Sequence, residues 1–252
     1  MVRRSTQEPD EEGRDGGFSR WNTHFSTVVN VTLLGTELRL SQDPKSLHLG
    51  TTVWDASIVL AKWLERNARK GELSREKLRG KAVLELGAGM GLAGFACALL
   101  GARVMLTDTA AVLPLLARNY EANLSPAALR SSGSELAGAV GPVEVRELDW
   151  FQPEQVAAAG GPYDFILAAD CVYNEALVDT LLRVVLALSN KRTTVVVANE
   201  LRSDAVQERF RTAFEHHFVI KRVPRAKLDA VHQHPSIDIL LLRRRSTPVQ
   251  AL

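Results

Sequence analysis

The stretch Val83-Leu-Glu-Leu-Gly-Ala-Gly-Met-Gly91 decides the fold of this 252-residue chain. It reads as a short apolar strand that breaks into three alternating glycines and continues into a helical stretch over 92–100. Because glycine has no Cβ, Gly87, Gly89 and Gly91 let the backbone take positive φ angles and approach a bound molecule closely. The pattern predicts a cofactor site where a strand meets a helix.

The spacing of the glycines separates two classes of cofactor. A dinucleotide fingerprint, G-x-G-x-x-G, needs its third glycine at position 92, where this chain has Leu92. The register is instead E-x-G-x-G-x-G, with Glu85 two residues before the first glycine, and it resembles motif I of the Rossmann-like S-adenosylmethionine (AdoMet) methyltransferases. A glycine loop alone is weak support for either class, so the rest of the chain has to agree.

Short apolar strands alternate with helical stretches from residue 81 onward, which predicts a parallel sheet covered on both faces through right-handed crossovers. The strands 218–223 and 237–242 then follow each other with no room for a long helix, so we expect an antiparallel hairpin. A dinucleotide fold would keep adding helical crossovers. The ending therefore favours an α/β, Rossmann-like methyltransferase sheet of seven strands. The five parallel strands are expected at 82–86, 103–107, 143–148, 163–169 and 193–198, and the helices at about 91–100, 111–122, 153–159, 175–189 and 204–215.

Two elements are expected before the main sheet. Residues 28–40 are rich in β-branched side chains around Gly35, which predicts a hairpin, and residues 54–64 carry apolar side chains at helical spacing. The segment 125–142 is rich in Ser, Ala and Gly and is expected to be a flexible loop insertion. We divide the chain into a disordered tail (1–17), an N-terminal hairpin and helix (18–80), the methyltransferase domain (81–245) and a second tail (246–252), with 18–245 forming one globular unit.

The composition excludes several classes of partner. A net charge of +2 gives no electrostatic reason to expect nucleic acid, and no apolar run is long enough to cross a membrane. Cys97 and Cys171 are the only cysteines, so neither a disulfide framework nor a zinc site is indicated. His232 and His234 have no third ligand nearby and are interpreted as a polar hairpin loop, with no metal. We expect a monomer in the cytoplasm, with the nucleus as a second location.

Polar side chains stand at the ends of the predicted parallel strands, where ligands bind in open α/β sheets. Asp108 ends the second strand, from which a carboxylate can accept hydrogen bonds from both ribose hydroxyls; the alternative is a cap for the next helix. Glu85 either caps the glycine turn or lies below the methionine part of the cofactor. Asp149 and Trp150 end the third strand and could hold an adenine, although a tryptophan there is often core.

The most discriminating local feature is Asp170-Cys-Val-Tyr173, directly after the fourth strand. Together with Leu-Gly-Thr-Thr-Val-Trp-Asp-Ala at 49–56, Glu-Leu-Gly-Ala-Gly-Met-Gly at 85–91 and Asn-Tyr-Glu-Ala-Asn-Leu at 119–124, this D-x-x-Y resembles the family 16 protein lysine methyltransferases of the methyltransferase-like 21 type. The resemblance covers about residues 25–243. It implies AdoMet as cofactor, S-adenosylhomocysteine as product and the ε-amine of a lysine in a nonhistone protein as acceptor, with a chaperone or a translation elongation factor as partner.

The same resemblance assigns the site residues. Asp170 and Tyr173 would line the acceptor pocket as the catalytic pair, Asp170 by orienting the incoming ammonium and Tyr173 by shaping the pocket. Two departures, Met90 where many relatives have Thr and Asp149 where a close branch has Thr, remove no required group. The expected cofactor-binding residues are Trp54, Glu85, Gly87, Ala88, Gly89, Gly91, Asp108, Asp149, Trp150 and Ala169.

Other readings remain for the acceptor and for the activity. An arginine acceptor usually needs paired carboxylates, and the chain has no double-Glu loop, whereas histidine or a small molecule stays an alternative acceptor. A non-catalytic adaptor that keeps the cofactor pocket is a further alternative, although every expected cofactor position is filled. A dehydrogenase is disfavoured by Leu92 and the closing hairpin.

Overall fold

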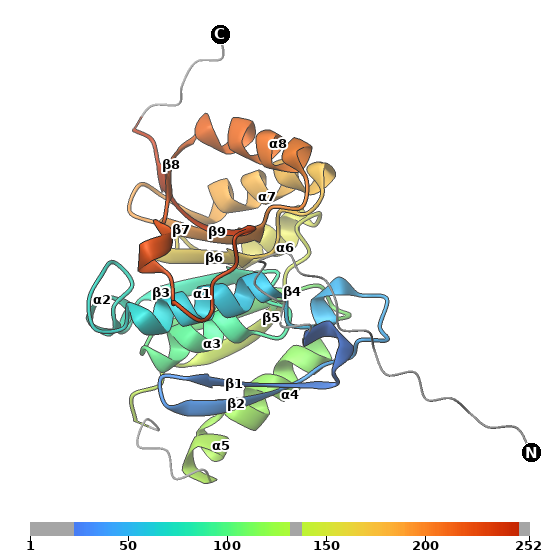
Figure 1. The fold of residues 1–252 in the computed structure, drawn as a ribbon. Helices are drawn as coiled ribbons and strands as arrows, with labels where there is room; N and C mark the ends of the chain where they lie inside the picture. Colours follow the sequence, from blue (N-terminus) through green and yellow to red (C-terminus); the bar gives the residue numbers. More distant parts are fainter. Residues whose placement is uncertain (1–22, 132–137, 247–252) are drawn as a thin grey trace, which may run out of the picture.

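The computed structural model describes residues 23–131 and 138–246, and a seven-stranded sheet forms its centre (Figure 1). The strand order is β5-β4-β3-β6-β7-β9-β8. Within this sheet β3 to β7 pair in parallel, and β9 runs antiparallel to both of its neighbours, β7 and β8. The predicted methyltransferase sheet is thus confirmed. Its strands are β3 (Ala82–Leu86), β4 (Arg103–Asp108), β5 (Val143–Glu147), β6 (Phe165–Ala169), β7 (Thr194–Glu200), β8 (Phe218–Arg222) and β9 (Ile237–Arg244).

The central strands are buried on both faces, which is why they read as continuous apolar runs. Successive side chains of a strand point to opposite faces, so Leu167 of β6 belongs to one core and its neighbours Ile166 and Ala168 to the other. The first core includes side chains of α1 (Asp55–Arg66), α3 (Leu92–Leu99) and α4 (Leu113–Asn123). The second includes those of α7 (Glu175–Leu188) and α8 (Asp204–Glu215), and α6 (Pro153–Ala158) packs against it through the partly buried Val156.

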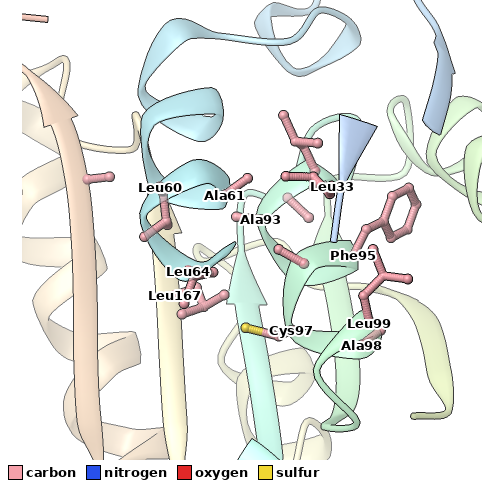
Figure 2. Packing of buried hydrophobic residues seen from close by; sticks show 14 of the residues in the cluster. Leu33, Leu60, Ala61, Leu64, Ala93, Phe95, Cys97, Ala98, Leu99 and Leu167 are labelled. Atoms are coloured by element: carbon pink, nitrogen blue, oxygen red, sulfur yellow. The ribbon is translucent and has the colours of Figure 1, made fainter. Parts of the chain in front are cut away.

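Helix α3 is buried along its whole length, because α1 lies against it on the sheet. Figure 2 shows Leu60 and Leu64 of α1 on one side of this core and Ala93 and Cys97 of α3 on the other. The small side chains of α3 let the two helices approach closely. This packing fixes where α3 begins, and therefore where the glycine turn before it lies.

The N-terminal hairpin, β1 (Val28–Leu33) and β2 (Thr36–Ser41), forms a two-stranded sheet of its own. Leu34 and Gly35 both have positive φ, as a two-residue hairpin turn requires. The hairpin docks on α4 through two asparagines one turn apart. Asn119 accepts a hydrogen bond from the Ser41 amide at 2.8 Å and donates to the Ser41 carbonyl at 3.0 Å, and Asn123 binds the backbone of Arg39 in the same way.

Gln42 connects this hairpin to the segment before α1. Its side-chain oxygen accepts a hydrogen bond from the Val53 amide at 2.5 Å, and its amide nitrogen donates to the carbonyls of Thr23 and Ser26, each at 2.7 Å. The hydroxyl of Thr23 donates to the Val53 carbonyl. A short 3-10 turn, η2 (Leu49–Thr51), lies in the connection. The chain between hairpin and helix is therefore held by hydrogen bonds at both ends.

The expectation of a flexible loop over 125–142 was wrong at its start, because α5 (Pro126–Ser131) occupies the first residues. The Ser125 hydroxyl accepts a hydrogen bond from the Ala128 amide at 3.2 Å, Pro126 suits a helix start, and Leu129 is buried. Residues 132–137 lie outside the described part of the chain. The short helix α2 (Arg75–Leu78), with Leu78 buried, was not predicted.

The proposed division into a globular unit over 18–245 and two tails stays a prediction. Residues 1–17 and 247–252 lie outside the described ranges, as do 18–22. Across residues 23–131 and 138–246, no helix combines the length and apolarity needed to cross a bilayer.

Candidate active site

A cavity of about 250 Å³ opens where the parallel strands end. It lies beside the glycine turn after β3, Asp108 at the end of β4 and Ala169 at the end of β6. The segment before α1 completes the wall. Ten of the predicted site residues line this cavity: Trp54, Gly87, Ala88, Gly89, Asp108, Asp149, Trp150, Ala169, Asp170 and Tyr173.

The glycine turn faces the cavity with its backbone. Gly87 and Gly89 have φ angles of 59° and 54°, a region that favours glycine. A Cβ on Gly87 would lie 2.9 Å from the sulfur of Cys171, and one on Gly89 would lie 3.1 Å from the carbonyl oxygen of Gly50. Both positions therefore need glycine for conformation and for space.

Gly91 serves the core, not the cavity wall. It occupies the N-cap position of α3 with φ 84°, and a Cβ there would lie 2.8 Å from Leu116 and 3.0 Å from Phe95. The structure thus places this predicted cofactor residue behind the turn, where its small size lets α3 pack against α4.

Glu85 also lies behind the cavity wall. It points to the face opposite its neighbours Leu84 and Leu86, is 1% exposed and accepts a hydrogen bond from the Gly94 amide at 2.8 Å. Burial raises its pKa to about 8; the Gly94 hydrogen bond opposes this rise, and the charge of Asp108 adds to it. Of the two roles considered for Glu85, this contact is nearer to the cap, although the amide that it binds belongs to α3 and not to the glycine turn itself.

Asp108 is fixed in the wall by two backbone amides. Its carboxylate accepts hydrogen bonds from Gly89 and from Thr109, both at 2.8 Å. Burial raises the pKa of Asp108, while these amide hydrogen bonds oppose the rise. Helix α4 begins at Leu113 with Val112 at its N-cap position, so Asp108 does not cap that helix. A carboxylate oxygen can accept a second hydrogen bond, which leaves capacity for ribose hydroxyls.

Asp149 and Trp150 are both half-buried at the cavity, which disfavours a purely core role for the indole. The Asp149 carboxylate accepts a hydrogen bond from the Phe151 amide at 2.9 Å, forming a tight turn. The Trp150 ring lies 3.4 Å from the position of a Cβ on Gly87, so it borders the glycine turn directly.

Asp170 adopts an unusual backbone conformation, with φ 59°, and its side chain is almost fully buried. The guanidinium of Arg202 donates to both of its carboxylate oxygens at 2.6 Å. Arg202 also lies 2.7 Å from Glu200 and stacks over the ring of Trp54, with its central carbon 5.3 Å from the ring centroid. Asp170, which was predicted to line the acceptor pocket, is therefore held by Arg202, a residue that the sequence analysis did not identify.

Asn199 holds the rest of the 170–173 turn. Its side chain accepts a hydrogen bond from the Val172 amide at 2.9 Å and donates to the Val172 carbonyl at 2.7 Å. Tyr173 lines the cavity and is 44% exposed. Burial raises the pKa of Tyr173, and the nearby Cys171, Asp108 and Asp170 raise it further. Its hydroxyl therefore stays protonated at neutral pH.

Sequence reasoning missed several residues of the wall. Gly50, Thr52 and Ser57 line it from the segment around Trp54. Gly50 and Thr52 belong to the stretch 49–56 that was used for the family resemblance, in which only Trp54 was given a role. Arg202, which binds Asp170 but does not itself line the cavity, had a usable signal, because it follows the strand end Asn199-Glu200 by two residues. The remaining missed wall residues are Leu49, Val53, Met90, Leu92, Thr109, Leu148, Phe151, Cys171 and Leu177.

Among the residues that the structure describes, no three His, Cys, Asp or Glu side chains converge to hold a metal ion. A nitrogen of His232 lies 3.0 Å from a carboxylate oxygen of Asp229, within the loop between β8 and β9.

The cavity residues suit a nucleoside with an attached amino acid. Side chains at Gly87 and Gly89 would intrude on the cradle, Asp108 offers a buried acceptor, and Trp54 and Trp150 provide flat apolar walls. These features fit the predicted cofactor AdoMet.

Comparison with known proteins gives the family. Residues 33–217 match the family model described as lysine methyltransferase. The chain is 37% identical to protein N-lysine methyltransferase METTL21A of Danio rerio, over 77% of this chain and 80% of the relative. It is 31% identical to METTL21A of Mus musculus, over 92% of each chain, and 26% identical to EEF1A lysine methyltransferase 3 of Xenopus tropicalis, over 89% of this chain and 95% of the relative.

Solved structures agree on the fold. The 16S rRNA N2 G1207 methyltransferase RsmC of T. Thermophilus, solved with AdoMet and guanosine, superposes with a TM-score of 0.53 at 18% identity, over 86% of this chain and 50% of that one. A SAM-dependent methyltransferase from Agrobacterium tumefaciens gives a TM-score of 0.52 at 16% identity, over 87% and 70% of the two chains. The chain therefore belongs to the lysine methyltransferase family, and the prediction of an AdoMet-dependent protein N-lysine methyltransferase is confirmed.

Proposed function

We propose that the cavity presents the ε-amine of a lysine in a nonhistone protein to AdoMet, with Asp170 and Tyr173 on the acceptor side. The observation that carries this assignment is that both residues share one cavity with the glycine turn and Asp108. Tyr173 is also the more exposed of the pair, as an acceptor arriving from outside would require.

The cofactor side is assigned to the residues that form the cradle and its walls. AdoMet supplies a methyl group already activated by a sulfonium, so the protein mainly has to position the reactants. We assign ribose binding to Asp108 and walls for the adenine to Asp149 and Trp150. The backbone of 87–89 and the side chains of Trp54 and Ala169 complete the binding surface.

The acceptor amine must lose a proton before it can react. With an unperturbed pKa of about 10.4, forming the neutral amine at pH 7 costs about 4.6 kcal/mol. Burial of the lysine lowers this cost, because desolvation disfavours the charged form. In this arrangement Asp170 helps to position the 170–173 turn against the acceptor. Tyr173 forms an aromatic wall, and its hydroxyl can donate a hydrogen bond to the amine or accept one from it.

Tyr173→Phe tests this assignment. Because the ring remains and only the hydroxyl is lost, turnover should fall by about tenfold or more while AdoMet affinity stays within about threefold. Tyr120→Phe is the matched control, since Tyr120 lies on α4 and does not line the cavity. Calorimetry with AdoMet and a methyl-transfer assay measure the two quantities. Equal losses of affinity and turnover in Tyr173→Phe would contradict an acceptor-side role.

We further propose a translation elongation factor or a molecular chaperone as the partner. One relative is named for its substrate EEF1A, which supports the first choice. The exposed apolar side chains of Leu49, Phe151 and Tyr173 line the cavity and suit a protein surface that covers the opening. Labelled AdoMet with a cell extract, followed by mass spectrometry of the labelled band, would identify partner, residue type and degree of methylation. Label on histidine or on a small molecule would overturn the lysine assignment.

The enzyme is proposed to act as a monomer in the cytoplasm, with the nucleus as a second location. Two buried, unpaired cysteines are consistent with a reducing compartment. Light scattering of the purified protein tests the first statement, and imaging of a tagged chain tests the second.

A further inference from the structure

Arg202 forms a set of polar contacts beside the acceptor side of the cavity. Its guanidinium makes a two-pronged ion pair with Asp170, contacts Glu200 at 2.7 Å and stacks on Trp54. Asp170 and Glu200 are nearly buried, with 3% and 6% of their side chains exposed, and 31% of the Arg202 side chain is exposed. Two buried carboxylates thus share one cation beside the cavity.

This arrangement bears on the acceptor amine, and here the inference rests on the proposed function. A carboxylate within about 4–6 Å of an amine typically raises the pKa of that amine by about 1–3 units, which opposes deprotonation. An uncompensated Asp170 would therefore hold the lysine in its unreactive ammonium form. With Arg202 bound to both oxygens of Asp170, this pair carries no net charge, and Arg202 cancels one of the two negative charges of Asp170 and Glu200. The part of the penalty that Asp170 would impose is thus largely removed.

We propose that Arg202 is a positioning residue that neutralises Asp170 and keeps the 170–173 turn in place. The ammonium group of the acceptor lysine can then lose its proton more easily and react as a neutral amine. Asp170 in turn anchors the guanidinium of Arg202, which is not among the residues that line the cavity. Stacking on Trp54 fixes the plane of the guanidinium and connects the acceptor turn to the segment that precedes α1.

Other ionisable groups face the same region and set the background field. Burial lowers the pKa of the Arg202 guanidinium, but the hydrogen bond and charge of Asp170, with Glu200 and Asp55, outweigh it and raise the pKa. Arg202 therefore stays charged over the whole range in which lysine titrates. The groups around the acceptor side are Asp170 from the end of β6, Glu200 and Arg202 from the end of β7, Asp55 from the start of α1, Asp108 from β4, and Cys171 and Tyr173 from the turn.

The pH dependence of turnover tests this role. The probe is the protein that the extract experiment identifies, prepared in recombinant form and used at saturating concentration with the full-length enzyme. In the wild type, the acidic limb of the profile reports deprotonation of the bound lysine. Arg202→Gln should move this limb upward by about one pH unit, because Asp170 and Glu200 then stabilise the ammonium. Arg202→Lys keeps the charge and should leave the limb in place, with lower turnover from the lost two-pronged geometry.

Two further variants separate charge from structure. Asp170→Asn with Arg202→Gln removes both charges and should return the limb toward the wild-type position. Arg209→Gln is the matched control, because Arg209 on α8 forms a comparable ion pair, at 2.5 Å from Asp179 on α7, and does not line the cavity. It should not move the limb. Calorimetry with AdoMet and thermal melting establish that each variant is folded.

An acidic limb of Arg202→Gln that coincides with the wild-type limb would overturn the proposal. If that variant does not fold, Asp170→Asn decides: the retained cation should move the limb to lower pH, and an unmoved or raised limb would contradict the assignment. Failure of the proposed function looks different, because the wild type itself would then transfer no methyl group to lysine.

Discussion

Glu85 and the glycine turn show how single residues shape the site without touching the reaction. Glu85 lies under the turn with its carboxyl group bound to the Gly94 amide, in a place that water does not reach. Gly87 faces the cavity with no room for a side chain. Both residues support the cradle, Glu85 through a hydrogen bond and Gly87 through its small size, and each gives a separate prediction.

The buried acid makes stability depend on pH. Its pKa is raised from an ordinary 4.5 to about 8, so between these values the folded protein binds a proton that the unfolded chain has released. The free energy of unfolding should therefore fall as pH rises from about 5 to 8. Glu85→Gln keeps an acceptor for Gly94 and should remove this slope, which amounts to about 1.4 kcal/mol per pH unit. Urea unfolding of the cofactor-free protein at several pH values measures it. Parallel curves for variant and wild type would show that Glu85 stays ionised when folded.

Gly87→Ala tests the cradle against a matched glycine. Gly80 also has a positive φ, 71°, but nothing lies within 4 Å of a Cβ there, whereas a Cβ on Gly87 would lie 2.9 Å from the Cys171 sulfur. Both substitutions carry a backbone strain of about 1 kcal/mol. Only Gly87→Ala should also weaken AdoMet binding, by at least about tenfold, as measured by calorimetry. Similar affinities for the two variants would show that the turn does not contact the cofactor.

Helix α3 illustrates the element scale, because its position sets the glycine turn. All eight of its residues are buried, and Gly94 faces the sheet so closely that a Cβ would lie 2.2 Å from Leu106 and 2.5 Å from Glu85. The helix can therefore approach β3 and β4 only because this position has no side chain. The same helix packs against α1, whose first turn follows Trp54.

Gly94→Ala should destabilise the protein although alanine is the better helix former. At an exposed helical position the change would stabilise by about 1 kcal/mol, whereas overpacking here should cost about 1–3 kcal/mol. Thermal melting of the cofactor-free protein shows whether Gly94→Ala lowers or raises the stability. A higher melting temperature would mean that α3 can move off the sheet without loss.

The molecule as a whole depends on how the N-terminal hairpin is attached. The hairpin forms its own sheet, and Asn119 binds both the amide and the carbonyl of Ser41, as a further strand would. The same side chain donates to the sulfur of Met90 in the glycine turn, at 3.3 Å. Gln42, the next residue, holds Val53 at the cavity wall. The hairpin, α4 and the cofactor cradle therefore form one connected set of hydrogen bonds.

Asn119→Ala should loosen this connection. It leaves the Ser41 amide and carbonyl without their partner in a partly buried place, at a cost of about 1–3 kcal/mol. It should also weaken AdoMet binding, because Gln42, the residue after Ser41, holds Val53 at the cavity wall. Asn123→Ala, one turn away and more exposed, is the control with a smaller expected loss. Hydrogen exchange of the Ser41 amide and calorimetry measure the two effects. Unchanged exchange in Asn119→Ala would contradict the role given to this side chain.

Local sequence determined most of the fold and the outline of the site. Alternating apolar strands and helices, the closing antiparallel pair and the polar strand ends all follow from periodicity and from where ligands bind in open sheets. Ser125 to Ser131 departed from expectation, because a serine cap and one buried leucine outweighed a loop-like composition. The 170–173 motif marked the acceptor side before any contact was known.

Only the tertiary structure decided which predicted residues reach the cavity and which partner holds them. Strand alternation and helix packing placed Glu85 and Gly91 behind the wall, and neither effect is visible in a motif. Arg202 meets Asp170 across 32 residues of chain because β6 and β7 are neighbours in the sheet. Short-range patterns encode elements and their ends, whereas ion pairs between strand ends arise only once the sheet has brought those ends together.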